Sequence, residues 1–484
     1  MQPPGRTPKV PPPAQSRPPG LRLRSATPQH CFPALPDAQT AQLMAILQQL
    51  EQSQWWSPDQ LREHQFLQLR ALLTFVHGAI PFYRKRLPAA GIAPDQDLAA
   101  ERWARMPVLT RAQVQTHVQS LLAKKPPAGH RQLGRAQTSG STGTPVRVAT
   151  SETTRLLWQA FTLREHYWHG RDFDASLAVI RHFGEGVDAA YPDGMALEDW
   201  GPPVSLLHAS GPAMALDIHT DPRAQLEWLA RTGPAYLLTF PSNAAALAQL
   251  SLAEGRTLAG LRQVRLVSEA VDAPLRDMLQ RAWGAPVVDT YSAQEAGVLA
   301  LQCPEHPHYH VQSENVLLEV VDEDGEPCAP GETGRVLLTT LHNFAMPLIR
   351  YEVGDYAEVG AACDCGRGLP VLTRILGRVR NMLALPDGGR RWPNLSAPFY
   401  REIAPMIQHQ LIQLDLQHIE VRLVTERPLT AGEEQALSEL IVRRLGHPFA
   451  LRFSYPERIE RSATGKFEEF VCQVDAAAPE GVTP

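Results

Sequence analysis

The chain has 484 residues, of which 44% are hydrophobic and 20% are charged, and its formal net charge at pH 7 is −5. This length exceeds what one hydrophobic core supports, so two or three domains are expected. The negative balance argues against bulk nucleic-acid binding, and because no apolar run reaches eighteen residues, no membrane span is predicted. No apolar segment opens the chain, so a secretory signal is not predicted and the cytoplasm is the expected location.

The first 36 residues are rich in proline and carry five basic but no acidic side chains. This composition predicts a disordered, polyproline-like tail, either a partner-binding arm or a dispensable extension. Order is expected from about Thr40. Ser57, Pro58 and Gln60 supply the cap, the first-turn proline and the third-position partner of a helix start. Apolar residues then follow at helical spacing: Leu69, Leu72, Leu73 and Val76.

Residues 138–144 read Thr-Ser-Gly-Ser-Thr-Gly-Thr. Glycines let backbone N–H groups turn toward a ligand, and hydroxyls add donors that can follow a moving phosphate. The common phosphate loop requires Gly-Lys-Ser/Thr, and that lysine is missing here. The segment therefore predicts a lysine-free phosphate loop, with a plain surface turn as the alternative. The residues expected to contact a nucleotide are Thr138, Ser139, Gly140, Ser141, Thr142, Gly143 and Thr144.

From about residue 150 to 300, apolar runs alternate with helical stretches, as in an α/β domain with mostly parallel strands. The expected strands are 176–180, 235–240, 264–267 and 287–289, and the expected helices are 222–231, 242–253 and 274–283. Between 308 and 360 a small antiparallel β region is predicted, with strands at 316–321 and 334–340. A smaller α+β unit is expected at 378–484, with strands at 420–424 and 450–456 and a helix at 431–445.

Six further blocks follow one another in a fixed order: Tyr291–Glu295, Gly331–Gly334, Pro347–Tyr351, Gly354–Asp355, Gly377–Arg378 and Gly465–Lys466. Together with the loop at 138–144, they make the chain resemble the phenylacetate–coenzyme A ligase family of adenylate-forming, AMP-binding enzymes. The resemblance covers about residues 45–475. It implies a large multi-layer adenylation domain at 37–377 after the tail at 1–36, and a small mobile α+β lid at 378–484.

Three residues of these blocks have a direct physical reading. Glu295, just beyond a strand, offers a hard oxygen ligand for the Mg²⁺ that bridges ATP phosphates. Tyr291, in a block expected to follow a strand, would stack on adenine or line the acyl pocket, with a core aromatic as the alternative. Asp355 offers two oxygens to the ribose hydroxyls, the role implied by the resemblance, whereas a turn-forming aspartate is the alternative.

The remaining site residues depend more on the resemblance. Ser292 and Glu269 are placed with the nucleotide, Glu269 through a weak match to the family's adenine-side segment. Arg378 corresponds to a nucleotide-contacting arginine where the two domains join. The family usually has two aspartates after Gly-Arg-X, whereas this chain has Arg380 and Asn381. A hinge needs tolerant backbone angles more than a given charge, so the small domain is expected to turn although both aspartates are replaced.

Lys466 is the expected catalytic lysine. A lysine on a mobile loop can reach the substrate carboxylate and the α-phosphate, which repel one another as they meet. The implied mechanism has two steps, in which a carboxylate attacks MgATP to give acyl-AMP and pyrophosphate, and coenzyme A then displaces AMP. Lys466, Glu295 and Thr142 carry the first step, and no nucleophile on the protein is required.

Cysteines and histidines also predict a metal site. Cys363 and Cys365 form a tight C-x-C turn, and Cys303 precedes His306, His308 and His310. Two such clusters separated by a β region are typical of structural tetrahedral zinc, and some members of the family are similar here. The expected ligands are Cys303, His310, Cys363 and Cys365. His306 remains an alternative to His310, and buried free thiols are the alternative to a site.

Two other functions stay open. The acyl group could pass to a carrier-protein thiol or an amine, because those enzymes share every adenylation residue. The chain could instead be a non-catalytic nucleotide-binding scaffold, although a scaffold has no need of Lys466. The expected partners are a small carboxylic acid, ATP and coenzyme A. The identity of the acid, the role of the tail and the oligomeric state, including a homodimer, are left open.

Overall fold

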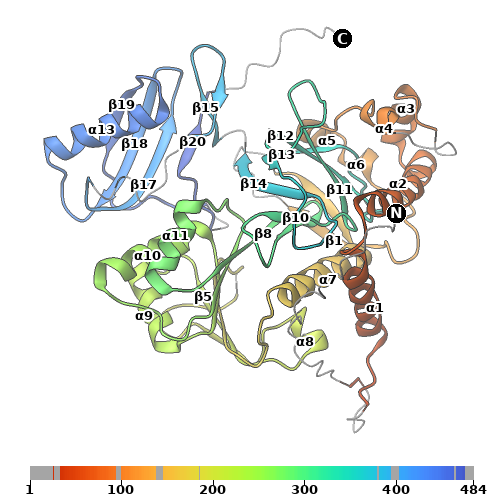
Figure 1. Ribbon diagram of the computed structural model, residues 1–484, viewed down its shortest axis with the longest axis horizontal. Coiled ribbons are helices and arrows are strands. Elements are labelled where there is room, and N and C mark those ends of the chain that lie inside the picture. Colours follow the sequence, from red (N-terminus) through yellow and green to blue (C-terminus); the bar gives the residue numbers. More distant parts are fainter. Residues whose placement is uncertain are drawn as a thin grey trace, which may run out of the picture.

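The computed structural model describes residues 25–26, 33–93, 100–137, 145–184, 186–378, 381–393, 400, 403–462 and 465–474. Most of the predicted tail, the whole predicted phosphate loop at 138–144, and residues 379–380 at the predicted hinge lie outside this part. In the described part, a large domain is built on a twelve-stranded mixed sheet, and a four-stranded sheet forms a separate C-terminal domain (Figure 1). None of the described helices is long and apolar enough to cross a membrane.

In the described part, six helices come first: α1 Ala38–Ser53, α2 Pro58–Ala79, α3 Pro81–Ala89, α4 Ala100–Ala104, α5 Arg111–Thr116 and α6 Val118–Leu121. The start of α2 is as predicted, because Ser57 and Gln60 form a reciprocal capping box around Pro58. The predicted apolar stripe of α2 is buried and packs against the antiparallel part of the main sheet. The N-terminal helices therefore cover that part of the sheet.

The main sheet joins parallel and antiparallel strands in one layer, in the order β11-β12-β13-β14-β10-β9-β8-β7-β6-β3-β5-β4. Its strands are β3 Leu177–Arg181, β4 Met195–Leu197, β5 Ala213–Asp217, β6 Tyr236–Thr239, β7 Gln263–Val267, β8 Val287–Ala293, β9 Gly297–Gln302, β10 Tyr309–Val311, β11 Val316–Val321, β12 Thr333–Thr340, β13 Tyr351–Val359 and β14 Val371–Arg378. Strands β5, β3, β6, β7 and β8 are parallel neighbours. The predicted α/β class is confirmed, and the antiparallel region continues the parallel sheet.

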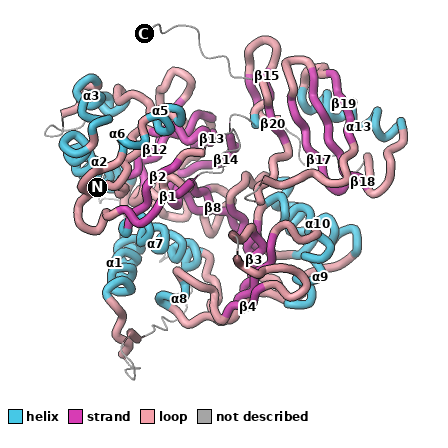
Figure 2. The backbone as a smooth tube through the Cα atoms, turned by 180° about the vertical axis from the view of Figure 1, so that it is seen from behind, coloured by secondary structure: helices cyan, strands magenta, loops and turns pink. Residues whose placement is uncertain are grey.

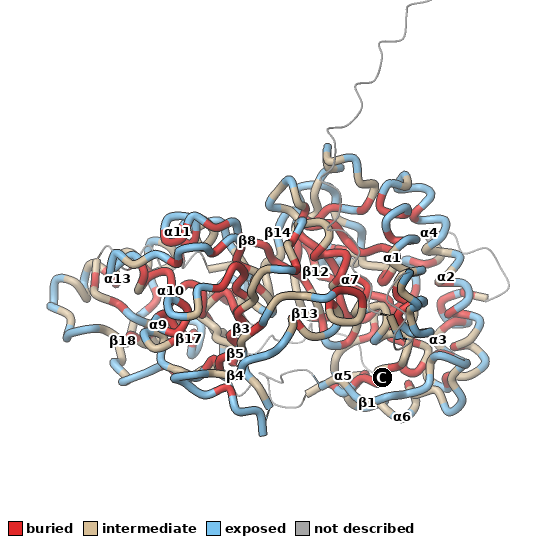
Figure 3. The backbone as a smooth tube through the Cα atoms, turned by 90° about the horizontal axis from the view of Figure 1, so that it is seen from below, coloured by how far each residue is buried: buried red, intermediate tan, exposed pale blue. Residues whose placement is uncertain are grey.

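Helices cover both faces of the parallel strands, as buried parallel sheets require. Leu237 and Leu266 pack on one face with α9 Pro222–Thr232, α10 Pro241–Glu254 and α11 Ala273–Trp283. Tyr236 and Leu301 pack on the other face in a cluster that includes α1, α7 Glu152–Trp168 and α8 Val204–Leu207. Seen from below, buried residues follow the strands of the sheet, whereas many exposed residues lie on the outer helices (Figure 3).

A hairpin, β1 Gln132–Gln137 and β2 Arg147–Ser151, flanks the loop at 138–144 on both sides. The C-terminal domain contains β15 Leu383–Ala384, β16 Arg390–Arg391, β17 Met406–Gln413, β18 His418–Thr425, α13 Ala431–Leu445, β19 Ala450–Ser454 and β20 Phe470–Cys472. Its sheet has the order β19-β18-β17-β20. Figures 1 and 2 place this sheet beside α10, at the edge of the large domain.

Candidate active site

Three strands of the main sheet bring predicted nucleotide residues together. The hydroxyl of Tyr291 on β8 donates to Oδ2 of Asp355 on β13 at 2.9 Å. Nε of Arg378 lies 3.5 Å from Oδ1 of the same carboxylate, because Asp355 and Arg378 are opposite one another in the β13–β14 register. Burial, with Asp355 nearby, raises the pKa of Tyr291 well above its usual value, so its hydroxyl stays a donor.

One sequence expectation is corrected at this point, and one alternative is excluded. Tyr291 and Ser292 do not follow a strand but lie in β8, which continues to Ala293 because its last residues pair with β9. Asp355 is not a turn residue, since it lies within β13. Thr290 and Tyr291 have high β propensity, and this was the signal in the sequence that the strand extends beyond residue 289.

Glu295 lies in the turn between β8 and β9 and is only 5% exposed. The hydroxyl of Tyr351, at the start of β13, is 3.4 Å from its Oε1 and donates to it. Burial raises the pKa of Glu295, and the positive charges of Arg378 and Arg111 oppose that rise. A divalent ion bound to this buried carboxylate would offset the cost of burial and restore the ionised form.

The Pro347–Tyr351 block combines two roles that the sequence did not separate. Tyr351 contacts Glu295, whereas Arg350 is a buried architectural residue. The Arg350 guanidinium donates to the carbonyls of Ala104 and Met106 at 2.6 and 2.8 Å. It also pairs with Glu319 at 3.1 Å. Arg350 thereby ties the segment after α4 to β11, and its backbone has a φ of 46°.

Lys466 and Glu269 belong to a second group, at the carboxyl ends of β5, β6 and β7. Gly465 is buried, and a Cβ there would lie 2.8 Å from Cγ2 of Ile218 and 3.0 Å from Cε2 of Phe240. The loop that carries Lys466 is therefore in contact with the large domain. Glu269 accepts a hydrogen bond from the backbone N–H of Phe467 at 2.8 Å, so it contacts this loop directly.

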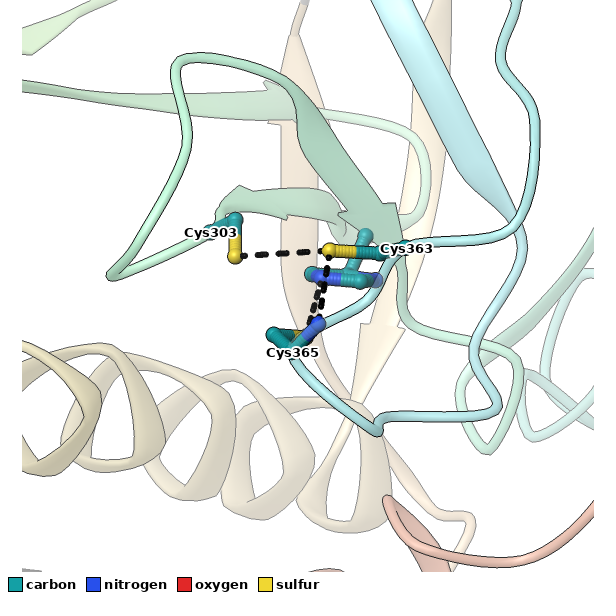
Figure 4. Close-up of side chains that lie close together, drawn as sticks. Cys303, Cys363 and Cys365 are labelled. Carbon is teal, nitrogen blue, oxygen red and sulfur yellow. Dashed lines mark hydrogen bonds between the residues drawn. The ribbon is translucent and has the colours of Figure 1, made fainter. Parts of the chain in front are cut away.

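The predicted zinc ligands converge in the described structure. The ligand atoms of Cys303, His310, Cys363 and Cys365 all lie within 4.8 Å of one another. Sγ of Cys303 is 4.0 Å from Sγ of Cys363, and Sγ of Cys365 is 3.4 Å from Nε2 of His310 (Figure 4). Nδ1 of His310 is 3.4 Å from the carbonyl oxygen of Leu369, which leaves Nε2 free to act as a ligand.

This cluster fits a tetrahedral thiophilic ion by its donor set. Burial raises the pKa of the Cys363 thiol to about 12 and lowers that of His310 to about 4. Two neighbouring thiols cannot both ionise there unless a cation compensates their charges. The alternative histidine, His306, instead lies 2.6 Å from Oδ1 of Asp364.

The turn after the cluster is anchored by an arginine between two indole rings. The guanidinium carbon of Arg367 lies 4.8 Å from the ring centroid of Trp55 and 4.6 Å from that of Trp168. Its Nε donates to Oε1 of Gln54 at 3.0 Å. The cysteine turn is thereby attached to the end of α1 and to α7.

Two family models match parts of the chain. Residues 136–346 match the AMP-binding enzyme family, and residues 393–473 match the CapK C-terminal domain. The chain is 27% identical over 424 residues to a phenylacetate–coenzyme A ligase of Thermus thermophilus, covering 83% of this chain and 89% of that protein. A phenylacetate–coenzyme A ligase of Escherichia coli is 26% identical over 68% of this chain and 74% of its own length. The chain carries an AMP-binding enzyme domain.

The resemblance to phenylacetate–coenzyme A ligases predicted from the sequence blocks is confirmed. The AMP-binding match contains Tyr291, Glu295 and the loop at 138–144, whereas Lys466 lies in the CapK C-terminal match. Among solved structures, 2-hydroxyisobutyryl-CoA ligase in its postadenylation state has a TM-score of 0.65 at 18% identity, covering 85% of this chain and 89% of that one. The same ligase in its thioesterification state has a TM-score of 0.54 at 19% identity, covering 86% and 90%.

Proposed function

We propose that this protein is an ATP-dependent acyl-coenzyme A ligase that forms AMP and acts on phenylacetate or a similar aryl acid. The observation that carries the proposal is the convergence of Tyr291, Asp355 and Arg378 beside a buried carboxylate, Glu295. Strands β8, β13 and β14 of the one sheet, and the turn after β8, bring these side chains together. The ligase activity is supported by relatives and solved structures whose names specify coenzyme A ligases.

In adenylation, each of these side chains has a task that its surroundings permit. Tyr291 and Arg378 orient the Asp355 carboxylate, whose remaining lone pairs accept hydrogen bonds from the ribose hydroxyls. Glu295 would hold Mg²⁺, which on binding neutralises phosphate charge. Residues 138–144 hold the outer phosphates. Lys466 stabilises the two anions as the acid's carboxylate attacks the α-phosphorus and pyrophosphate leaves.

Thioester formation needs a different position of the small domain. Coenzyme A supplies the thiol, the acyl carbon–sulfur bond forms, and AMP leaves with the bonding pair of the broken acyl–phosphate bond. The higher TM-score to a postadenylation state than to a thioesterification state supports an adenylation-like arrangement here. The domain limits 37–377 and 378–484, and turning near Arg378, belong to this proposal. Transfer to a carrier-protein thiol or an amine is the competing activity.

Lys466→Ala separates the two half-reactions. Without the cation, acid-dependent pyrophosphate release with phenylacetate should fall by several orders of magnitude, each decade corresponding to about 1.4 kcal/mol. Conversion of supplied phenylacetyl-AMP and coenzyme A to the thioester should persist, because the turned domain carries Lys466 away. Both rates are measured on the same preparation.

An acid screen with and without coenzyme A is the control for this test. If no aryl, short-chain or long-chain acid changes pyrophosphate release by the wild-type protein, the ligase proposal is removed. Equal loss of both half-reactions in Lys466→Ala would contradict a turning domain.

We further propose that Cys303, His310, Cys363 and Cys365 hold a structural zinc ion. Adenylation and thiol attack need no zinc-bound water, so the ion would act on stability and not on the chemistry. The buried donor set with ligand atoms within 4.8 Å of one another supports this assignment.

A further inference from the structure

We infer that Glu269 is a positioning residue that fastens the Lys466 loop to the large domain during adenylation. It belongs to a group of five residues, called the latch here: Ser242, Glu269, Arg461, Gly465 and Phe467. The inference rests on the proposed ligase function, because it assigns to the latch the position of Lys466 in one half-reaction. It differs from the adenine contact that the sequence predicts for Glu269.

The Glu269 carboxylate bridges the two domains with both of its oxygens. Oε2 accepts from the backbone N–H of Ser242, in the first turn of α10, at 2.8 Å. Oε1 accepts from the backbone N–H of Phe467, the residue after Lys466, also at 2.8 Å. Hydrogen bonds to an ionised carboxylate are about twice as strong as neutral ones. One carboxylate therefore holds the helix and the lysine loop in a fixed relation.

Arg461 closes the latch from the other side. Its Nη1 donates to Oγ of Ser242 at 2.8 Å and to the carbonyl oxygen of Gly465 at 3.1 Å. Burial lowers the pKa of Arg461, and the negative charge of Glu269 opposes that shift. Arg461 and Phe467 of the small domain thus contact Ser242 and Glu269 of the large domain, and Gly465 lies against Ile218 and Phe240.

Backbone geometry points to the same arrangement. Gly465 has a φ of +82° and no room for a Cβ against Ile218 and Phe240, so the loop docks more closely than a side chain would allow. Ser268, immediately before Glu269, has a φ of 75° although it is not glycine. Such a conformation is uncommon and persists where the surroundings fix it. It presents Glu269 toward the loop at the end of β7.

The latch has consequences for only one half-reaction. When the small domain turns for thioester formation, the hydrogen bonds from the Phe467 N–H to Glu269 and from Arg461 to Ser242 must break, and water replaces them. Weakening the latch should therefore slow adenylation and leave thioester formation unchanged. Affinity for ATP should change little, because Glu269 contacts the loop.

The main test uses Glu269→Gln, whose amide places a donor opposite one of the two backbone N–H groups. Acid-dependent ATP–pyrophosphate exchange with phenylacetate should lose about tenfold or more in kcat, with KM for ATP within about threefold of the wild type. Thioester formation from supplied phenylacetyl-AMP should stay within about twofold. Gly465→Ala, which adds the excluded Cβ, should show the same split.

Glu254→Gln is the matched control, because it removes an exposed carboxylate at the other end of α10, where Glu254 pairs with Arg223. It should leave both half-reactions unchanged. A raised KM for ATP with unchanged kcat in Glu269→Gln would establish the adenine contact and overturn the latch. Equal loss of both half-reactions would also overturn it.

A readout without substrate separates this inference from the ligase proposal. Hydrogen exchange of the peptide spanning residues 465–470 should be faster in Glu269→Gln than in the wild type or in Glu254→Gln, since the Phe467 N–H loses its acceptor. Unchanged exchange would overturn the latch even if the protein is an active ligase. Faster exchange in a protein that activates no acid would retain the latch and remove the ligase function.

Discussion

Asp355 shows how one side chain can be both an internal partner and a ligand-binding group. Each of its oxygens has one contact within the protein, to Tyr291 and to Arg378, and a carboxylate oxygen has two lone pairs. The internal contacts fix the carboxylate, which would otherwise lose rotational freedom when the nucleotide binds. The sequence predicted all three residues as nucleotide contacts. Their contacts with one another are visible only in the structure, where the β13–β14 register sets Arg378 opposite Asp355 and Tyr291 approaches from β8.

Asp355→Ala should raise KM for ATP about 10- to 100-fold, because two hydrogen bonds to a charged group are lost. KM for the acid should change little, since Asp355 is assigned to the ribose. Tyr291→Phe serves as the comparison, because it removes only the hydroxyl that orients the carboxylate, and its effect should be smaller. Steady-state kinetics with ATP and the acid varied separately measure both effects. Unchanged ATP dependence in Asp355→Ala would exclude the nucleotide role.

At the scale of elements, the sequence predicted those helices and strands whose positions depend on residues close together in the chain. The capped start of α2, the helices α9 to α11 and the strands β3, β6 and β7 all follow from periodicity, caps and β-branched residues. The turn at Glu295 separates two apolar strands and was expected at the end of one. The role of Arg350 could not be predicted, because its acceptors, Ala104 and Met106, lie about 240 residues away in the chain.

A buried ion cluster was equally invisible to the sequence. Glu165 on α7 is 2.6 Å from Arg171 and 2.5 Å from Arg265 on β7. Burial would raise the pKa of Glu165, but the two guanidinium groups hold it well below its usual range. The helical pattern of α7 does not predict that Glu165 pairs with Arg265, because Arg265 belongs to a strand 100 residues further along. Pairing across distant elements is decided by the sheet order and not by local periodicity.

The cysteine cluster gives a prediction at the scale of elements, since it joins β10 to the segments after β9 and β13. Cys365→Ser should remove the metal and lower the free energy of unfolding, by about 4 kcal/mol if free zinc is 1,000 times its dissociation constant. Metal analysis and thermal unfolding of the purified protein measure the two effects.

Cys472→Ser is the control, because Cys472 lies in β20, and a serine hydroxyl can keep its contact with Gln413. Its metal content should match that of the wild type. Absence of zinc from wild-type protein, together with free reactivity of Cys303, Cys363 and Cys365, would remove the site.

At the scale of the whole molecule, the proposed mechanism assigns the work to a fixed and a movable part. The side chains on β8, β13 and β14 share one continuous sheet, whereas Lys466 reaches the large domain on a loop of another sheet. The sequence predicted both parts from blocks that match a family. It could not place them relative to one another, because that relation depends on contacts such as the one between Glu269 and Phe467, 198 residues apart.

Stacking of Arg367 between two indole rings also gives the molecule an optical property. The Trp168 ring lies edge-on to the His310 imidazole, with ring centroids 5.9 Å apart, so this fluorophore borders both the proposed zinc ligands and a guanidinium charge. Indole emission responds to nearby charge. Adding a chelator should therefore change the emission of the wild-type protein but much less that of Trp168→Phe, which keeps the other eight of the nine tryptophans. An equal change in both proteins would mean that the signal comes from general unfolding.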